Sequence, residues 1–292
     1  MVSTLRVGRV PVTHLDRILY PSQGITKEEV ISYYIRVAPR ILPFLSGRVV
    51  VMQRFPQGIM NQGFFEKDTP HGTPEWVTLF PHFSTIAGRE IRYVVCDSLD
   101  TLIWMANLAA LELHIALAGT LDPESPDMLL FDLDPEPPAG FPDAVKTGLA
   151  LRDLLGDLGL SPFVKTSGKK GLHIVVPLER QYSFDATRSF VHAVGVLMAR
   201  RMPGVISELA GTHKPGTVFV DYLQNAAWKT MVAPYSLRAT AQATVSMPVS
   251  WEEIKREILP EDFTIQTAIS RERDPWEKFF DQAEPLPVVT NE

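Results

Sequence analysis

Hydrophobic residues at helical spacing and short β-branched runs organise the first part of the chain. The capping-box pattern Thr26 to Glu29 precedes apolar residues at helical spacing, which predicts a helix. The β-branched run at 49–55 then predicts a strand. Residues 61–76 have the composition of a loop, although two adjacent aromatic residues lie within it.

The most apolar segment of the chain, Thr101 to Gly119, follows a predicted strand at 91–97. Glu112 and His114 interrupt it, and its longest apolar run is shorter than the roughly 20 residues that a membrane span needs. We therefore expect a buried helix here and no membrane partner.

The hydrophobic pattern is clearest in the middle of the chain, where it predicts the order β-α-β-β-α-β. The four expected strands cover residues 128–134, 162–166, 171–178 and 217–223. Asp143 and Asp185 are the expected caps of the two helices. With right-handed crossovers, the first strand should lie between the third and the last.

Acidic residues occur on two strands that this order makes neighbours. Asp132 and Asp134 lie two residues apart, so both side chains point to one face of the sheet, and Asp221 interrupts the apolar alternation of the last strand. Carboxylates so close repel each other unless a cation or a proton lies between them. Three of them suit a two-metal phosphoryl-transfer site, whereas two alone are also compatible with a solvated strand end.

The turn Ser167 to Gly171, with the sequence SGKKG, separates the second and third strands. Its backbone N–H groups, with Lys170 and His173, can hold phosphate oxygens beside the carboxylates. It is not a P-loop, because the spacing of that motif is absent and a strand follows. Taken alone, it is an ordinary basic hairpin turn.

Composition narrows the class of protein. The net charge of −6 argues against a wholly basic surface for nucleic acid but leaves room for a local basic patch. The single cysteine, Cys96, excludes an intramolecular disulfide framework and a multi-cysteine zinc site. No basic segment followed by an apolar run opens the sequence, so we expect no signal peptide and a cytoplasmic location.

Several spaced motifs together resemble one family. FDLDP, SGKKGLH and VDYLQN, in this order, resemble the polymerase domain of bacterial and archaeal ATP-dependent DNA ligase D, a member of the archaeo-eukaryotic primase superfamily. Further similar segments are DRILYPSQGITK, QRFPQG, FFEK, LELH and APYSLRA. The resemblance covers roughly residues 12–272 and is specific because the spaced motifs agree with one another.

The resemblance implies an α+β fold of the primase type, in which an RRM-like β-α-β-β-α-β catalytic core packs against an N-terminal α/β unit. We expect one primase-polymerase catalytic domain over residues 1–272, with the N-terminal unit at 12–120 and the core at 128–240. Residues 273–292 should form an acidic, proline-bearing tail.

The resemblance also assigns roles to individual residues. The metal-binding and catalytic carboxylates would be Asp132, Asp134 and Asp221. The residues that hold the incoming nucleotide would be Ser167, Lys170 and His173 at its phosphates, Phe64 or Phe65 under its base, and His114, Gln224 and Arg238 near its sugar and the active site. The residues that contact DNA, at a 5′-phosphate or at the primer and template strands, would be Arg17, Lys27, Arg54 and Lys67. The family often has lysine at the position of Arg17, where arginine keeps the charge.

The function implied by the resemblance is that of a template-directed nucleotidyltransferase, a DNA-dependent DNA or RNA polymerase that prefers ribonucleotides. It would use nucleoside triphosphates and two Mn²⁺ or Mg²⁺ ions to fill gaps and extend 3′ ends during nonhomologous end joining. Its DNA would carry gaps or double-strand-break ends with a 5′-phosphate. No K-x-D-G ligase motif occurs, so a Ku-like protein and a DNA ligase, in trans or in a larger chain, are the expected partners.

Two alternatives are weighed against this function. FDLD also resembles the nucleophile loop of haloacid-dehalogenase-type phosphatases, in which Asp132 would be phosphorylated, but Pro135 and the long preceding unit do not fit that class. The second alternative is a non-catalytic DNA-end-binding module that keeps the fold and the phosphate pocket. The complete set of three aspartates argues against it.

Overall fold

The chain folds into two compact units, neither of which is a continuous stretch of sequence. A computed structural model describes residues 5–208 and 214–287. The first unit comprises Met1–Ala116, Thr230–Ser246 and Glu261–Glu272, and the second comprises Leu117–Lys229, Met247–Pro260 and Arg273–Glu292. The division differs from the expected one, because residues 230–240 join the first unit and not the core predicted at 128–240.

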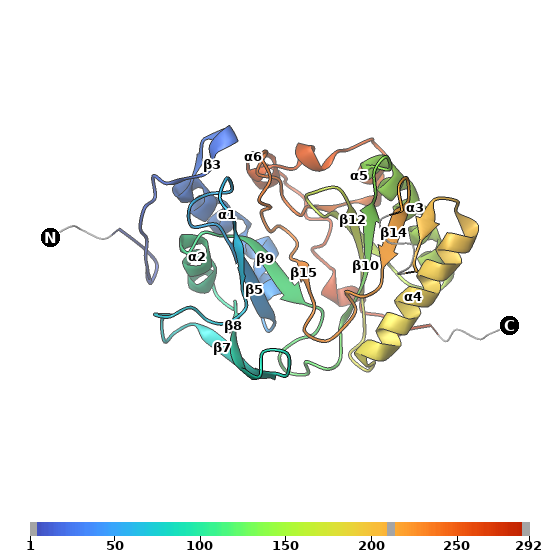
Figure 1. Cartoon of the computed structure of the whole chain (residues 1–292), viewed down its shortest axis with the longest axis horizontal. Helices are drawn as coiled ribbons and strands as arrows, with labels where there is room; N and C mark the ends of the chain where they lie inside the picture. The colour runs from blue at the N-terminus through green and yellow to red at the C-terminus, as the bar shows by residue number, and fades with distance from the viewer. Residues whose placement is uncertain (1–4, 209–213, 288–292) are drawn as a thin grey trace. The chain divides into compact units, whose positions relative to one another are not determined.

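The first unit is built on an antiparallel sheet with the strand order β15-β9-β5-β8-β7, to which β6 adds by pairing with β5 (Figure 1). These strands are β5 (Val49–Arg54), β6 (Phe64–Glu66), β7 (Thr78–Ser84), β8 (Arg89–Val95), β9 (Ala110–Ala116) and β15 (Thr230–Val232). Two small hairpins precede them, β1 (Arg6–Val7) with β2 (Val10–Pro11) and β3 (Ile18–Tyr20) with β4 (Ile25–Thr26). The helices are α1 (Lys27–Leu45), α2 (Leu99–Asn107), α6 (Ile265–Ile269) and the 3-10 turn η1 (Pro21–Gln23).

Helix α1 confirms the prediction made from its capping box. The Thr26 hydroxyl accepts from the Glu29 N–H at 3.3 Å, and the Thr26 N–H donates to the Glu29 carboxylate at 2.8 Å. Most of its apolar residues are buried, and the Tyr34 hydroxyl donates to the Leu111 carbonyl of β9 at 2.8 Å. The helix is thereby tied to the central strands of its own sheet.

The single buried helix expected over 101–119 is wrong. Helix α2 ends at Asn107, Ala109 adopts a left-handed φ of 57°, and residues 110–116 form strand β9. A continuous apolar run does not distinguish a buried helix from a strand that is covered on both faces, and six of the seven residues of β9 are buried. The loop expected at 61–76 likewise contains the short strand β6.

The second unit is built on a six-stranded sheet with the order β13-β14-β10-β12-β11-β16. Its strands are β10 (Met128–Pro135), β11 (Phe163–Thr166), β12 (Leu172–Pro177), β13 (Val205–Ile206), β14 (Val218–Asp221) and β16 (Pro248–Val249). The helices are α3 (Phe141–Asp157), α4 (Phe184–Arg201), α5 (Trp251–Ile254) and the 3-10 turn η4 (Phe280–Gln282), and a further 3-10 turn, η3 (Pro260–Asp262), follows α5. The predicted strand order is confirmed, since β10 lies between β12 and β14, and the short strands β13 and β16 are added at the edges.

The helix caps differ slightly from those predicted. Gly140 is the N-cap of α3, and Asp143 lies three residues inside, where its carboxylate accepts from the Gly140 N–H at 2.8 Å. Ser183 is the N-cap of α4, and Asp185 lies in the first turn. In both cases the acidic residue still lies at the positive end of the helix dipole.

Helix α3 covers one face of this sheet and so determines which face carries the polar residues. A Cβ added to Gly148 of α3 would lie 3.4–3.6 Å from the side chains of Leu133, Leu172 and Ile174. Side chains alternate between faces along a strand, so Asp132 and His173, their sequence neighbours, point to the opposite face. The sheet therefore has one apolar face against α3 and one face available for chemistry.

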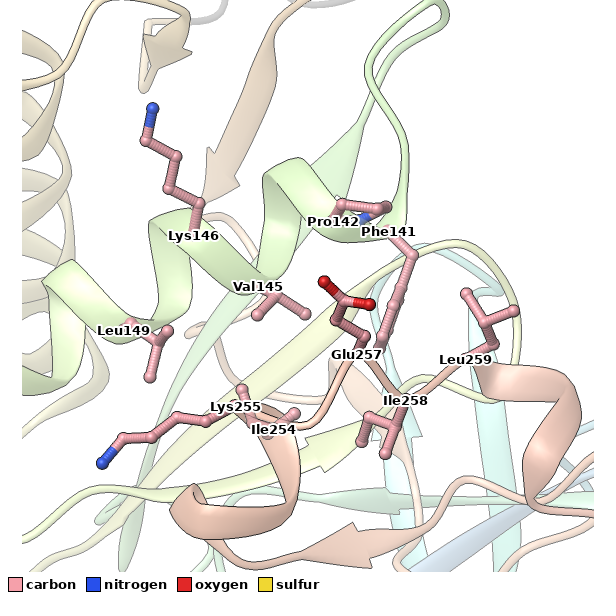
Figure 2. Close-up of a pocket in the computed structure, with 10 residues that line it drawn as sticks. All are labelled: Phe141, Pro142, Val145, Lys146, Leu149, Ile254, Lys255, Glu257, Ile258 and Leu259. Carbon is pink, nitrogen blue, oxygen red and sulfur yellow. The ribbon is translucent and has the colours of Figure 1, made fainter.

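Helix α3 also forms an apolar pocket of about 650 Å³ with the segment 254–259 of the same unit (Figure 2). Its apolar lining includes Val145, Leu149 and Ile258, with Lys146 among its polar residues. None of the predicted site residues lines it. No helix among the residues described here is long and apolar enough to cross a membrane.

The segment expected to be a peripheral tail is partly integrated into the second unit. Trp276 and Phe279 are buried and stack on each other with ring centroids 4.9 Å apart. The Trp276 indole N–H donates to the Val164 carbonyl of β11 at 3.0 Å. Residues beyond 287 lie outside the described part of the chain.

We predict that Trp276→Ala lowers the free energy of unfolding by about 3–5 kcal/mol, because it removes a large buried ring and the hydrogen bond to β11. Phe280→Ala is the matched control, since Phe280 is an exposed aromatic residue four positions later. Urea unfolding followed by fluorescence and circular dichroism would measure both variants. An equal and small effect of the two changes would show that this segment is a peripheral tail after all.

Candidate active site

A row of polar residues crosses four adjacent strands of the second unit. Asp132 of β10 is paired in register with Asp221 of β14 on one side and with His173 of β12 on the other. His173 is in turn paired with Lys165 of β11. Residues directly opposite each other in antiparallel strands project to the same face, so the four side chains form one row. Asp134 lies on the same face as Asp132.

His173 contacts its neighbour in the row on each side. His173 Nε2 lies 3.4 Å from Asp132 Oδ1, and His173 Nδ1 lies 3.0 Å from Lys165 Nζ. Lys165 is completely buried and His173 is nearly so. The structure thus brings together Asp132, Asp221 and His173 as predicted, and it adds Lys165, which the sequence analysis did not single out.

Asp221 is held by the turn that follows its strand. One carboxylate oxygen accepts from the Leu223 N–H at 2.8 Å, and the other accepts from the Gln224 side-chain amide at 3.2 Å. The buried amide of Asn225 accepts from the Leu130 N–H at 2.9 Å and donates to the Leu130 carbonyl at 2.7 Å. Asn225 therefore fastens the VDYLQN turn to β10, next to Asp132.

The SGKKG turn is shaped by Ser167 and by its glycines. The Ser167 hydroxyl accepts from the Lys169 and Gly171 N–H groups at 3.3 and 3.1 Å. Gly168 has a left-handed φ of 72°, and a Cβ on Gly171 would lie 2.4 Å from the Leu133 carbonyl oxygen. Glycine at position 171 lets the turn approach the β10 backbone closely, beside Asp134.

Lys170 extends from this turn toward the carboxylates. Its Nζ lies 4.0 Å from Asp134 Oδ1 and 3.8 Å from Glu136 Oε2, and the side chain is more than half exposed. Ion pairs of this length and exposure contribute little to stability. Lys170 can therefore move to an anionic ligand at little cost.

The aspartates on this face of the sheet are the candidate metal ligands. Within the described part of the chain, no group of three or more histidine, cysteine, aspartate or glutamate side chains is gathered in a way that could hold a metal ion. The shared face and register nevertheless place the carboxylates of Asp132, Asp134 and Asp221 as neighbours. Oxygen donors of this kind suit Mg²⁺ or Mn²⁺, which also bind water and phosphate oxygens.

In the first unit, the buried carboxylate of Glu112 connects two predicted site residues. Glu112 Oε2 lies 3.2 Å from both His114 Nε2 and Arg238 Nε. Glu112 Oε1 accepts from the Ala239 N–H at 3.0 Å. Because β9 is a strand, Glu112 and His114 project to the same face. In the sequence, Glu112 stands out only as a break in an apolar segment.

The two adjacent phenylalanines have different neighbours. Phe65 is 56% exposed and packs edge-on against the His114 ring, with centroids 5.4 Å apart. Phe64 is 45% exposed, and the Arg54 guanidinium lies 5.4 Å from its ring centroid. Successive residues of β6 point to opposite faces, so only Phe65 shares the neighbourhood of His114 and Glu112.

Arg17, Lys27 and Arg54 form a basic cluster at the start of α1. Burial, together with the nearby positive charges of Arg17 and Arg54, lowers the pKa of Lys27 to about 8. The Lys27 N–H donates to the Arg17 carbonyl at 2.8 Å, and the Arg54 guanidinium pairs with Glu66 at 2.5 Å. Positive charges held this close, at a helix N-terminus, favour an anionic ligand.

Lys67, the fourth residue predicted to contact DNA, is exposed and directly follows β6. Its position in the fold is compatible with a surface contact but does not place it in the basic cluster.

A sheet face that carries three aspartates, flanked by a basic turn, has groups that can hold metal ions and phosphate oxygens. Comparison with known proteins makes the class specific. The family model of the LigD primase-polymerase domain matches residues 26–276. The chain belongs to this family of nucleotidyltransferases.

The curated relatives are LigD proteins of non-homologous end joining. The bifunctional non-homologous end joining protein LigD of Bacillus subtilis is 32% identical over 97% of this chain and 46% of its own length. The multifunctional non-homologous end joining DNA repair protein LigD of Mycobacterium tuberculosis is 36% identical over 84% of this chain and 33% of its own length. The chain thus spans less than half the length of these curated relatives.

Among solved structures, the polymerase domain of Mycobacterium tuberculosis ligase D in complex with DNA matches with a TM-score of 0.86 and 33% identity. The match covers 94% of this chain and 99% of that one. The fold predicted from the sequence, a mixed α and β domain of the ligase D polymerase type, is therefore confirmed.

We predict that Gly171→Ala displaces the SGKKG turn from β10, because its Cβ would overlap the Leu133 carbonyl. The expected cost is about 1–3 kcal/mol in the free energy of unfolding. Gly156→Ala is the control, because nothing lies within 4 Å of its added Cβ on helix α3. There we expect a neutral or slightly stabilising change. Denaturant titrations that gave the two variants the same stability would contradict the close approach.

Proposed function

We propose that this chain is a template-directed polymerase domain that extends 3′ ends and fills gaps in DNA during nonhomologous end joining. The observation that carries the proposal is the row of Asp132, Asp221 and His173, paired in register beside the basic SGKKG turn. Membership of the LigD primase-polymerase family supports it. Membership of this family also argues against the phosphatase alternative, in which Asp132 would be a covalent nucleophile.

Asp132, Asp134 and Asp221 are the residues that would hold two Mn²⁺ or Mg²⁺ ions. Such ions would lower the pKa of a bound hydroxyl group and neutralise negative charge on the phosphates. Lys170 and the N–H groups of the SGKKG turn would orient the triphosphate, with His173 donating from Nε2. Asp221 is already oriented for this role by Leu223 and Gln224.

The family resemblance is the basis for proposing base and sugar contacts for residues of the first unit. Phe65 is the better candidate for the stacking platform, because it lies against His114, a residue that the family resemblance places near the sugar. Glu112 would hold His114 and Arg238 in place through its buried carboxylate. A preference for ribonucleotides belongs to this proposal, with His114 and Gln224 as the residues to test.

The basic cluster of Arg17, Lys27 and Arg54 would bind the 5′-phosphate on the far side of a gap or break, with Lys67 at the DNA backbone. A phosphomonoester carries close to two negative charges at neutral pH, which matches a cluster of three cations. The curated relatives are about two to three times longer than this chain, and their names describe bifunctional or multifunctional proteins. A DNA ligase and a Ku-like end binder are therefore the proposed partners.

We predict that Asp132→Ala and Asp221→Ala each reduce nucleotide incorporation on gapped DNA by about 1,000-fold, because each removes a carboxylate needed for charge neutralisation at the phosphates. The assay would compare ribonucleotides with deoxynucleotides, and Mn²⁺ with Mg²⁺. Asp185→Ala is the control, because Asp185 lies exposed in the first turn of α4. Undiminished incorporation in the row variants would refute the site, and an inactive wild-type protein that still binds DNA ends would support the non-catalytic alternative.

We predict that affinity for 5′-phosphorylated gapped DNA falls as the pH rises through about 8. Free Lys27 loses its proton near that pH, and a bound phosphate favours the charged form, so binding takes up a proton. The phosphate itself titrates near pH 6 and does not contribute. The limiting slope is about tenfold per pH unit.

Fluorescence anisotropy between pH 7 and 10 would measure this dependence on matched 5′-phosphate and 5′-hydroxyl DNA. Lys27→Arg is the informative variant, because arginine stays charged throughout this range. It should keep the preference for the 5′-phosphate and flatten the slope. The same slope in Lys27→Arg would assign the pH dependence to another group.

A further inference from the structure

Lys165 is a completely buried lysine in the second unit, and the proposed reaction has no role for it so far. It lies on β11, one strand away from His173 and two strands away from Asp132. Burying an ammonium group is costly unless hydrogen-bond acceptors surround it. We therefore expect Lys165, at the end of the row, to have a role that a buried apolar residue could not fulfil.

The contact between Lys165 and His173 has a defined direction. A lysine ammonium group has three donors and no acceptor. Lys165 Nζ lies 3.0 Å from His173 Nδ1, so a Lys165 ammonium group makes this ring nitrogen the acceptor, without a proton of its own. In a neutral imidazole the proton then resides on Nε2.

The other side of the ring requires the same arrangement. His173 Nε2 faces Asp132 Oδ1 at 3.4 Å, and an ionised carboxylate only accepts hydrogen bonds. Nε2 must therefore be the donor. The donor-only lysine and the acceptor-only carboxylate, on opposite sides of one ring, select the same tautomer.

We propose that Lys165 is a positioning residue that fixes His173 as the Nε2–H tautomer and holds the plane of its ring. The ring then presents one N–H donor toward Asp132 and toward any phosphate oxygen bound beside it. This inference rests on the proposed function for the role of His173 at the nucleotide, but the tautomer itself is a property of the protein without ligand.

The tautomer is measured directly by long-range ¹H–¹⁵N NMR on protein with labelled histidine, with His173→Asn to assign the signal. In the ligand-free wild type we expect an unprotonated, hydrogen-bonded Nδ1 and a protonated Nε2. In Lys165→Met the Nδ1 signal should move toward that of an imine nitrogen without a hydrogen bond. A proton on Nδ1 in the wild type, or an unchanged Nδ1 signal in Lys165→Met, would overturn the proposal. Neither result depends on polymerase activity.

A second variant protects the test against a loss of folding. Lys165→Gln keeps a polar side chain whose amide N–H can still donate to Nδ1, whereas the methionine of Lys165→Met cannot donate. We expect Lys165→Gln to retain more of the hydrogen-bonded Nδ1 signal than Lys165→Met does. Circular dichroism and thermal melting would identify which variants are folded, and folded Lys165→Gln and Lys165→Met proteins with the same Nδ1 signal would contradict the proposal.

A double-mutant cycle then separates positioning from a general structural role. Lys165→Met should raise KM for the incoming nucleotide about tenfold with a smaller change in kcat, as expected for one hydrogen bond to a charged ligand. In a His173→Ala background the same change should have no further effect. Additive effects would show that Lys165 does not act through His173. Lys146→Met, an exposed lysine on α3, is the control and should leave both constants unchanged.

Discussion

The register of β10 with its two neighbours is the constraint on which the candidate site depends. Pairing Asp132 with Asp221 and with His173 brings three strands' polar residues to one face. Because side chains alternate, a slip of one residue would turn the carboxylates into the apolar layer under α3. Two contacts oppose such a slip: the Asn225 amide pairs with both backbone groups of Leu130, and Gly171 lies against the Leu133 carbonyl. The motifs around the aspartates thus fix register as well as supplying ligands.

Both units bury ionisable side chains. In each unit, one buried side chain contacts several polar partners at once. In the first unit the Glu112 carboxylate is shared by His114, Arg238 and a backbone N–H group. In the second unit the His173 ring lies between Lys165 and Asp132. A buried ionised group is tolerated when it is paired and hydrogen-bonded, and the same contacts hold the partner in one orientation. Residues of no obvious chemical role can therefore set the geometry of those that contact a ligand.

The sequence was sufficient to predict the order of the central strands. Alternating strands and helices that are connected by right-handed crossovers allow few strand orders. The two neighbours of β10 could therefore be predicted from the sequence. The row of Asp132, Asp221 and His173 followed from that order. It was not sufficient for β9, because an apolar run that is covered on both faces has no periodicity to distinguish strand from helix. His114 and Glu112 were accordingly expected on a helix, where their spacing would not place both on one face.

Lys165, Glu112 and Asn225 were missed for a related reason. Each is a polar residue whose role depends on a partner distant in sequence, such as Leu130 for Asn225, and no local motif reports such a partner. We propose that the face carrying Asp132, Asp134 and Asp221 is a metal-dependent nucleotidyl-transfer site. Anomalous diffraction from crystals grown with Mn²⁺ and a non-hydrolysable nucleoside triphosphate tests this proposal most directly. We expect manganese peaks between these three carboxylates and the triphosphate. Manganese bound elsewhere, with the three aspartates uncoordinated, would contradict it.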